Sequence, residues 1–454
     1  MRCWIPPRCP ALRILFFGLV LIAGACTETG PVAIRGPDPQ QQPSQNAFPG
    51  LANALADVPS GGSLNVFVIH GMRTSADESE PNLRDSIAKR LGLTLEATRQ
   101  QVLPMARPEV TLHRQSLWAG RAADGTWSPC AKQDQPGGLA NCDAPYLDIN
   151  TYNAPYDRKV VFYSLNYWGT LVWIKCTQMV APDTELTGDF TLLGLGNAEY
   201  CNHRFGLASG IAPGATAASS SPELLDHAIK NLIMIWGFGD AAIVMSGYEK
   251  VLREEVRLGL AAERDDVARR MHAAFGDAYK QQSQRYAMIS ESLGSYILMD
   301  TLGYASDNDL YILCRASQVH MLANQISLLR LSQIRAALPL TGGVETPETA
   351  NDVAPHRPCW GSPGSRAVVA YHDPSDLLTF YVPPPGLQPA YVQQLQAKDI
   401  NVVVPFAPVY VPGVLADPVQ AHSSGQETDQ RIQDMIAYGS NGTSPNDHVV
   451  PMQR

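Results

Sequence analysis

Residues 286–302, YAMISESLGSYILMDTL, hold an apolar run, a turn of small residues and a second apolar stretch. The first run predicts a buried β-strand, and the last stretch predicts a helix. Between them stands Ser292, with the small residues Ser290 and Gly294 two positions before and after it. A strand-to-helix turn that is sharp enough to expose a serine nucleophile requires small residues at those two positions. The sequence therefore predicts that Ser292 is a nucleophile at such a turn.

Short apolar runs followed by helical stretches recur along the chain. Parallel strands that are buried on both faces show such continuous apolar runs, whereas half-exposed strands alternate. We therefore expect an α/β fold with a mostly parallel central sheet flanked by helices. Besides the strand before Ser292, strands are expected over 64–69, 160–167, 367–371 and 400–404, with another beginning at Val319 and a last one ending near Val411. Helices are expected over 81–91, 296–302 and 427–438.

The stretch from about Trp168 to Gln284 is unusually long for a connection between two strands. Its first part is irregular and rich in small residues. Its second part is expected to be helical, starting with Ser221 as an N-cap before Pro222 and continuing in amphipathic stretches over 243–260 and 265–284. We interpret residues 168–284 as an inserted helical cap region over the site.

The turn around Ser292 resembles the GxSxG motif of α/β-hydrolases, with Ser290 in place of the first Gly. An earlier strand of that family commonly ends in His-Gly, as the run VFVIHGM does at His70-Gly71. The resemblance implies the α/β-hydrolase fold. It also implies an oxyanion hole made by the backbone N–H groups of Leu293 and Met72.

A serine nucleophile needs a base that is itself oriented by a carboxylate. The family places the acid after the next-but-one strand and the histidine after the last strand. These positions imply Asp376 and His422, with Asp373 as the alternative acid. Either aspartate is otherwise a turn-capping residue. His448 lies beyond the last helix, and the other histidines precede or lie on other elements.

The first 25 residues predict an export signal. Three arginines precede an uncharged apolar run that is shorter than the roughly 20 residues of a membrane-spanning helix. The run ends at Ala23-Gly-Ala-Cys26, which resembles a bacterial lipobox with Ala23 where Leu is usual. The resemblance implies lipidation of Cys26, and Thr27 favours the outer membrane, facing the periplasm. Ordinary cleavage near Ala25, which gives a soluble periplasmic or secreted protein, is the alternative.

Residues 26–62 are rich in Pro, Gly, Gln and Ser. Such a composition buries too little apolar surface to offset its ordering entropy, so we expect a flexible tether there. The remaining residues, 63–454, are expected to form the hydrolase domain with its insertion.

Cys3 and Cys9 lie in the export signal and Cys26 is the lipidation candidate, which leaves six of the nine cysteines. An even number of cysteines suggests disulfides in an oxidising compartment. The preferred disulfides join cysteines that are neighbours in the sequence: Cys130–Cys142, Cys176–Cys201 and Cys314–Cys359. The alternative is that two or more of these cysteines are free and buried. No Cys/His spacing predicts a metal site, and no feature indicates a cofactor. The net charge of −9 and the scattered basic residues are not those of a nucleic-acid-binding face.

The resemblance implies a serine hydrolase that cleaves a small-molecule or lipid ester at the cell envelope, lipids being the esters that an anchored enzyme meets first. An acyltransferase or peptidase with the same triad is one alternative. A non-catalytic lipoprotein that keeps the fold as a binding or structural module is another. The sequence does not indicate an oligomeric state.

Overall fold

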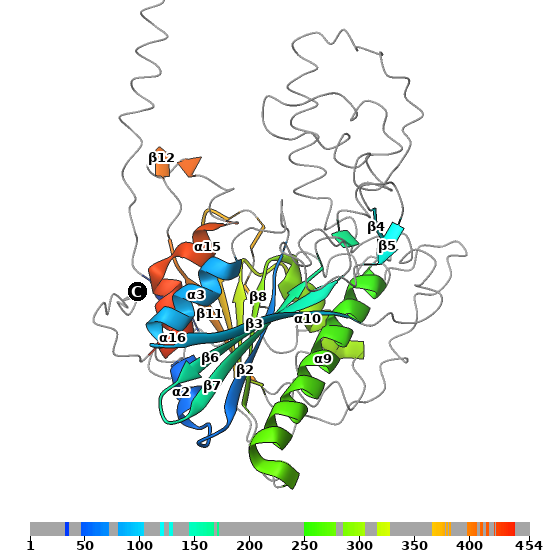
Figure 1. Cartoon of the computed structure of the whole chain (residues 1–454). Helices are drawn as coiled ribbons and strands as arrows, with labels where there is room; N and C mark the ends of the chain where they lie inside the picture. The colour runs from blue at the N-terminus through cyan, green and yellow to red at the C-terminus, as the bar shows by residue number, and fades with distance from the viewer. Residues whose placement is uncertain are drawn as a thin grey trace, which may run out of the picture.

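The computed structural model of the chain describes residues 32–35, 47–71, 80–103, 119–121, 127–129, 145–167, 170–171, 249–277, 285–304, 316–326, 366–376, 378–379, 381–382, 397–405, 409–411, 415–416, 422 and 424–440. Nine strands form one sheet in the order β1-β11-β10-β9-β8-β2-β7-β6-β3 (Figure 1). The six central strands run parallel: β2 (Ser63–Ile69), β7 (Arg158–Asn166), β8 (Arg285–Glu291), β9 (Ala316–Leu322), β10 (Ala367–His372) and β11 (Lys398–Val403). The expected α/β class with a mostly parallel sheet is therefore confirmed.

The continuous apolar runs predict these six parallel strands. β9 begins three residues before the expected Val319, and each of the other five is within two residues of its expected bounds. All seven residues of β2 are buried, as a strand covered on both faces requires. The antiparallel strands at the two edges are β1 (Ala33–Arg35), β3 (Thr94–Val102) and β6 (Tyr146–Ala154). The sequence pattern did not predict them, because β3 is polar and largely exposed and β1 is short.

The expectation that a last strand of the sheet ends near Val411 is wrong. β12 (Val409–Val411) pairs with β13 (Leu415–Ala416) in a separate small sheet, so β11 is the last strand of the main sheet in chain order. A further two-stranded sheet joins β4 (Ala119–Arg121) to β5 (Trp127–Pro129).

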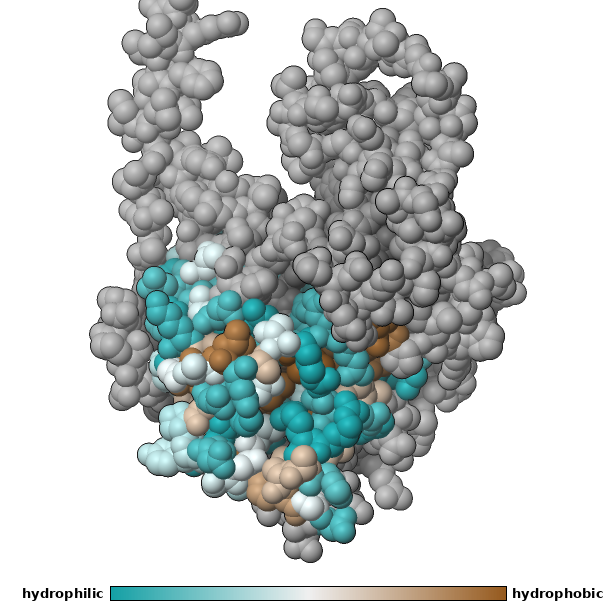
Figure 2. Space-filling view, in the orientation of Figure 1, coloured by the Kyte–Doolittle hydropathy of each residue, from teal (hydrophilic) through white to brown (hydrophobic). Residues whose placement is uncertain are grey.

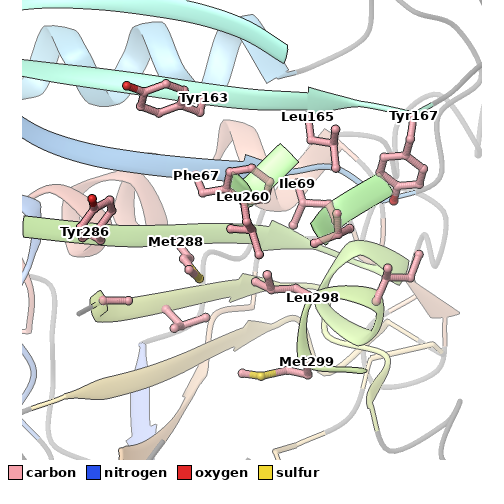
Figure 3. Close-up of a cluster of buried hydrophobic side chains, with 14 of the residues drawn as sticks. Phe67, Ile69, Tyr163, Leu165, Tyr167, Leu260, Tyr286, Met288, Leu298 and Met299 are labelled. Atoms are coloured by element: carbon pink, nitrogen blue, oxygen red, sulfur yellow. The ribbon is translucent and has the colours of Figure 1, made fainter. Parts of the chain in front are cut away.

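Helices cover both faces of the main sheet (Figure 1). α9 (Glu249–Phe275) and α10 (Leu293–Tyr304) pack on one face, and α2 (Leu51–Ala56), α3 (Glu80–Arg90) and α16 (Gln430–Tyr438) pack on the other. Figure 3 shows part of the hydrophobic core between the sheet and the helices α9 and α10. There Phe67 and Ile69 of β2 lie close to Leu260 of α9 and Leu298 of α10. None of the helices within these described stretches has the length and apolar character needed to cross a bilayer.

The C-terminal helix expected over 427–438 is two helices. α15 (Ser424–Thr428) is separated from α16 by Asp429, whose carboxylate accepts the N–H groups of Arg431 and Ile432 and so caps the second helix. α16 ends at Tyr438, as expected, with Gly439 as its C-cap.

The second part of the predicted insertion differs from the expectation. Instead of two helices, α9 runs unbroken from Glu249 to Phe275, because the residues between the two predicted segments are good helix formers. A Cβ on Gly259 would lie 3.2 Å from the ring of Phe67, so α9 packs tightly against β2. This part of residues 168–284 is a layer of the main fold and not a cap.

A buried polar cluster holds α9 on the sheet. Asp266 accepts hydrogen bonds from the Tyr163 hydroxyl at 2.8 Å and from Arg270 Nε at 3.1 Å, and Arg270 also donates to Asn65 at 2.8 Å. Glu263, one turn away, is fully buried, and neither of its carboxylate oxygens has a hydrogen-bond partner among the described residues. Burial raises the pKa of Glu263 well above its usual 4.5.

The predicted tether is wrong over its described residues. Val32 and Ala33 are buried at the start of β1, which pairs with β11. Leu51 and Leu55 of α2 are buried in the core on the face of the sheet that α2, α3 and α16 cover, and α2 also contacts α16. The Pro- and Gly-rich composition hid apolar residues at helical spacing, and these are sufficient to dock residues 47–62 on the fold.

The face shown in Figure 2 is mostly hydrophilic over the described residues, with small scattered hydrophobic areas. The cysteines at 26, 130, 142, 176, 201, 314 and 359 and the export signal lie outside the described residues, so lipidation and disulfide pairing stay predictions.

Candidate active site

Ser292 lies at a sharp turn between β8 and α10. Its φ of +49° is in the left-handed region, which residues with a side chain rarely adopt and which occurs preferentially at functional sites. Gly294 has no room for a side chain, because a Cβ there would lie 2.5 Å from the carbonyl oxygen of His70. The turn thus has the sharpness that the spacing of small residues predicts.

Ser290 stands where the resemblance to α/β-hydrolases expects glycine, and the structure explains how a serine fits. Its side chain is fully buried, with Oγ 3.0 Å from Oγ of Ser295 in the first turn of α10 and 3.4 Å from the carbonyl oxygen of His320. The extra hydroxyl therefore bonds the incoming strand to the outgoing helix and to β9.

The end of β2 closely approaches the turn. A Cβ on Gly71 would lie 2.5 Å from Cβ of Ser292 and 3.2 Å from its Oγ. The backbone before it is held by Tyr167, whose hydroxyl donates to the His70 carbonyl and whose ring stacks on the His70 ring with centroids 4.4 Å apart. His70 Nδ1 also lies 2.7 Å from the Gly71 carbonyl oxygen. These contacts of His70 fix the backbone at the end of β2.

The oxyanion hole is expected to consist of the backbone N–H groups of Leu293 and Met72. Leu293 is the first residue of α10 and is fully buried. The N–H groups in the first turn of a helix have no partner within the helix and lie at its positive end. The Leu293 amide is therefore suited to bind an oxyanion beside Ser292. Met72 lies outside the described residues.

Ser292, His422 and Asp376 form a hydrogen-bonded chain. Ser292 Oγ lies 2.9 Å from His422 Nε2, and His422 Nδ1 lies 3.0 Å and 2.9 Å from the two carboxylate oxygens of Asp376. Because an ionised carboxylate can only accept, Nδ1 carries the proton, and Nε2 accepts the hydrogen bond from Ser292. All three residues are at most 9% exposed, so water screens these contacts weakly.

The structure separates the two aspartates of the turn after β10. Asp373 accepts the backbone N–H of Ser375 on its carboxylate at 2.6 Å, and its carbonyl accepts the N–H of Asp376 at 3.0 Å, so it caps the turn. Asp376 faces His422, and its carboxylate also accepts the Leu378 N–H at 2.9 Å and the Thr379 hydroxyl. These additional donors fix the orientation of the Asp376 carboxylate.

Two glutamines that the sequence pattern did not single out also lie at the site. Gln426 of α15 accepts the N–H of Ala323 at 2.6 Å and donates to Asp376 Oδ2 at 3.4 Å. Gln325, in the loop after β9, has its amide nitrogen 3.2 Å from His422 Nε2. Gln325 follows the start of a predicted strand, and Gln426 comes just before the helix predicted over 427–438, which is too weak a signal to find them.

Three further described histidines, His320, His372 and His272, are bonded to or packed against residues other than Ser292 and Asp376 or are exposed. His320 is fully buried, with Nδ1 3.0 Å from the Tyr371 hydroxyl and Nε2 3.0 Å from Gln318 Oε1, and burial lowers its pKa to about 3. The ring of His372 packs edge-on against Tyr381. His272 is exposed near the end of α9. The other histidines, His448 among them, lie outside the described residues.

Within the part of the chain that the structure describes, no group of three or more His, Cys, Asp or Glu side chains is placed to hold a metal ion. Comparison with known proteins adds no assignment. No family model, no curated protein and no solved structure matches this chain.

Proposed function

We propose that this chain is a serine hydrolase that cleaves a carboxylic ester through an acyl-enzyme on Ser292. One observation carries the proposal, the continuous contact from Ser292 Oγ through the His422 ring to Asp376. A serine alone is a weak nucleophile, and a histidine oriented by a buried carboxylate is the arrangement that activates it. The left-handed backbone at Ser292 supports the same role, because it stands at the point where the hydroxyl must be presented.

The proposed reaction uses each of these groups in turn. Ser292 Oγ attacks the carbonyl carbon of the ester while His422 Nε2 takes its proton, and Asp376 stabilises the resulting imidazolium. The N–H of Leu293, together with that of Met72 as the resemblance implies, would stabilise the negative charge that develops on the carbonyl oxygen. The His422 proton then passes to the leaving alcohol as the ester C–O bond breaks. Water, activated by the same histidine, releases the acid from Ser292.

The order of the groups along the sheet supports the α/β-hydrolase fold. Ser292 comes directly after β8, and the His-Gly pair comes after the adjacent strand β2. Asp376 comes after β10, the next-but-one strand after β8 in the chain, and His422 comes after β11, the last strand of the sheet. This is the chain order that the resemblance implies. Two features are not part of this resemblance. Ser290 stands in place of the first Gly of the motif, and the antiparallel strands β3 and β6 come between β2 and β7 in the chain.

The location of the enzyme is part of the proposal. Export through the N-terminal signal and lipidation of Cys26 would hold the domain at the cell envelope, in the outer membrane facing the periplasm. Lipid esters are then the substrate class that the enzyme meets at the highest local concentration. Mass spectrometry of the mature N-terminus tests this point, because a diacylglyceryl-modified Cys26 and cleavage near Ala25 differ in mass.

The catalytic proposal is tested with a fluorophosphonate probe, which reacts with activated serines. We expect one adduct, located on Ser292 by peptide mapping, and no adduct in Ser292→Ala or in heat-unfolded wild type. We also expect hydrolysis of short p-nitrophenyl esters that Ser292→Ala abolishes without a change in melting temperature. A panel of p-nitrophenyl esters from acetate to laurate then measures the preferred acyl length. A folded wild-type protein that takes up no probe would instead be a binding or structural module.

A further inference from the structure

The loop after β9 is fixed against the serine turn. The Ser292 N–H donates to the carbonyl of Leu322, the last residue of β9, at 2.7 Å. Ala323, the next residue, has a φ of +49°, the same left-handed value as Ser292. Its N–H is held by the Tyr371 carbonyl at 3.2 Å and by Gln426 Oε1 at 2.6 Å. A strained backbone held by this many contacts indicates that the direction of the loop matters for the residues immediately after Ala323.

Gln325 is the residue that this loop directs toward His422. The Asn324 side chain accepts the N–H of Ile326 at 2.9 Å and closes a tight turn around Gln325. Gln325 is 4% exposed, and its side-chain amide nitrogen lies 3.2 Å from His422 Nε2. The same ring nitrogen is 2.9 Å from Ser292 Oγ, so serine and amide share one atom of the histidine.

The chemistry of an amide suits a partner of a group that gains and loses a proton. When Nε2 is unprotonated it accepts a hydrogen bond, which the amide NH₂ can donate. When Nε2 carries a proton it must donate, and a half-turn of the carboxamide about its last torsion presents Oε1 as the acceptor. The assignment of amide nitrogen and oxygen depends on the protonation state of the ring.

We infer that Gln325 is a positioning residue for the general base, donating to neutral His422 and accepting from the imidazolium. This inference rests on the proposed function. Its effect is greatest in the acyl-enzyme, where Oγ of Ser292 is esterified and has no proton to donate to Nε2. At that stage Gln325 and Asp376 hold the two nitrogens of the ring until water binds.

The first test compares Gln325→Met with Gln325→Glu in ester hydrolysis as a function of pH. Loss of one hydrogen bond to a charged group costs about 10- to 100-fold in rate, so Gln325→Met is expected to lower kcat by that factor with KM changed less than about threefold. In Gln325→Glu a carboxylate beside Nε2 favours the imidazolium and shifts the acid limb of the kcat/KM profile upward by about one pH unit. Of the described residues bonded to His422, Asp376 is titratable, and Ser292 and Gln325 are neutral.

Gln318 supplies a matched control. It is a buried glutamine of β9 whose Oε1 lies 3.0 Å from Nε2 of His320, and its amide donates to the Gly50 carbonyl at 2.7 Å. Gln318→Glu is expected to lower the melting temperature and to leave the acid limb where it is in the wild type. A merely structural role for Gln325 would make its variants behave like this control.

A second measurement needs no turnover. In protein with ¹⁵N-labelled histidine, the His422 signals are assigned by their loss in His422→Gln and monitored as a function of pH. We expect the titration midpoint to rise by about one unit in Gln325→Glu. An unmoved midpoint in a folded variant, or a Gln325→Met enzyme with kcat within twofold of wild type, would overturn the inference. A moved midpoint in a protein whose Ser292 takes up no fluorophosphonate would overturn the hydrolase proposal while supporting the contact of Gln325 with the ring.

Discussion

Gly71 and Ser292 approach each other so closely that a Cβ on the glycine would lie 2.5 Å from the Cβ of the serine. The end of β2 and the turn after β8 are therefore in contact through backbone and through the carbon that carries the Ser292 hydroxyl. This contact leads to the first prediction, because any side chain at position 71 must displace Ser292 or the loop.

Gly71→Ala is expected to reduce fluorophosphonate labelling of Ser292 by at least about 100-fold, since small displacements of reacting groups have effects of that size. Gly92→Ala is the control. Its φ of +66° makes the substitution strained, but an added Cβ meets nothing within 4 Å. Gly92→Ala should therefore lower the melting temperature and leave the labelling rate unchanged. Equal labelling of Gly71→Ala and wild type would show that the two segments move apart freely.

The second prediction separates the two aspartates after β10. Asp376→Asn keeps the shape of the side chain but presents a donor to His422 Nδ1, which favours the wrong tautomer and is expected to lower kcat by about 10⁴-fold. Asp373→Asn keeps an oxygen that can accept the Ser375 N–H, so kcat should fall less than about tenfold. Steady-state kinetics of both variants, with melting curves, check this. The reverse order of effects would assign the acid to Asp373.

The third prediction concerns Tyr167. Its hydroxyl donates to the His70 carbonyl, next to the glycine that approaches Ser292. Tyr167→Phe keeps the ring that stacks on His70 and removes that hydrogen bond, so we expect kcat to fall by roughly 3- to 30-fold with a small change in melting temperature. Tyr156→Phe, at a residue that is 78% exposed, is the control and should change neither quantity. A Tyr167→Phe enzyme with wild-type kcat would remove Tyr167 from the set of groups that position the loop.

The fourth prediction is a dependence of stability on pH that comes from Glu263. Its folded-state pKa lies well above 4.5, whereas the unfolded chain ionises this carboxyl near 4.5. As the pH rises above 4.5, the unfolded state releases a proton that the folded state keeps, so the free energy of unfolding falls by at most about 1.4 kcal/mol per pH unit. Glu263→Met removes the carboxyl at similar volume. We expect it to be more stable than wild type at pH 7, by an amount that shrinks toward pH 4.5.

Urea denaturation at several pH values measures this difference. Glu254→Met is the control, because Glu254 lies on the same helix, paired with Arg257 at 2.7 Å, and is partly exposed. Its free energy of unfolding should change with pH as that of the wild type does. A constant difference between Glu263→Met and wild type from pH 4 to pH 8 would mean that Glu263 is ionised in the folded protein.

The centre of the fold could be predicted from the sequence, but its edges could not. β2 and β8 are continuous apolar runs because helices cover both of their faces, and that environment leaves a clear pattern. β3 is polar and mostly exposed, so its sequence, TLEATRQQV, resembles that of a loop or an exposed helix. Its place is set by pairing with β6, a long-range contact that no local pattern records.

The site was predictable where chain order decides it. Ser292, Asp376 and His422 each come after a strand whose pattern was readable, and the structure brings all three together. The choice between Asp373 and Asp376 stayed open because the two lie three positions apart in one turn, and only side-chain direction separates them. Gln325 depends on the left-handed backbone at Ala323, which the sequence does not indicate because alanine seldom adopts it.

The pairing of β1 with β11 limits how far a lipid-anchored form could stray from its bilayer. Ala33 lies beside Val403, at the end of the sheet where the parallel strands finish and Ser292 stands. Six residues separate Cys26 from Ala33 and can span at most about 25 Å, whereas a free segment over 26–62 would reach more than about 100 Å. With Cys26 acylated, the segment between the lipid and the domain would be short, and it would join the domain at the end of the sheet where Ser292 lies. The domain would then stay close to the membrane that holds its anchor.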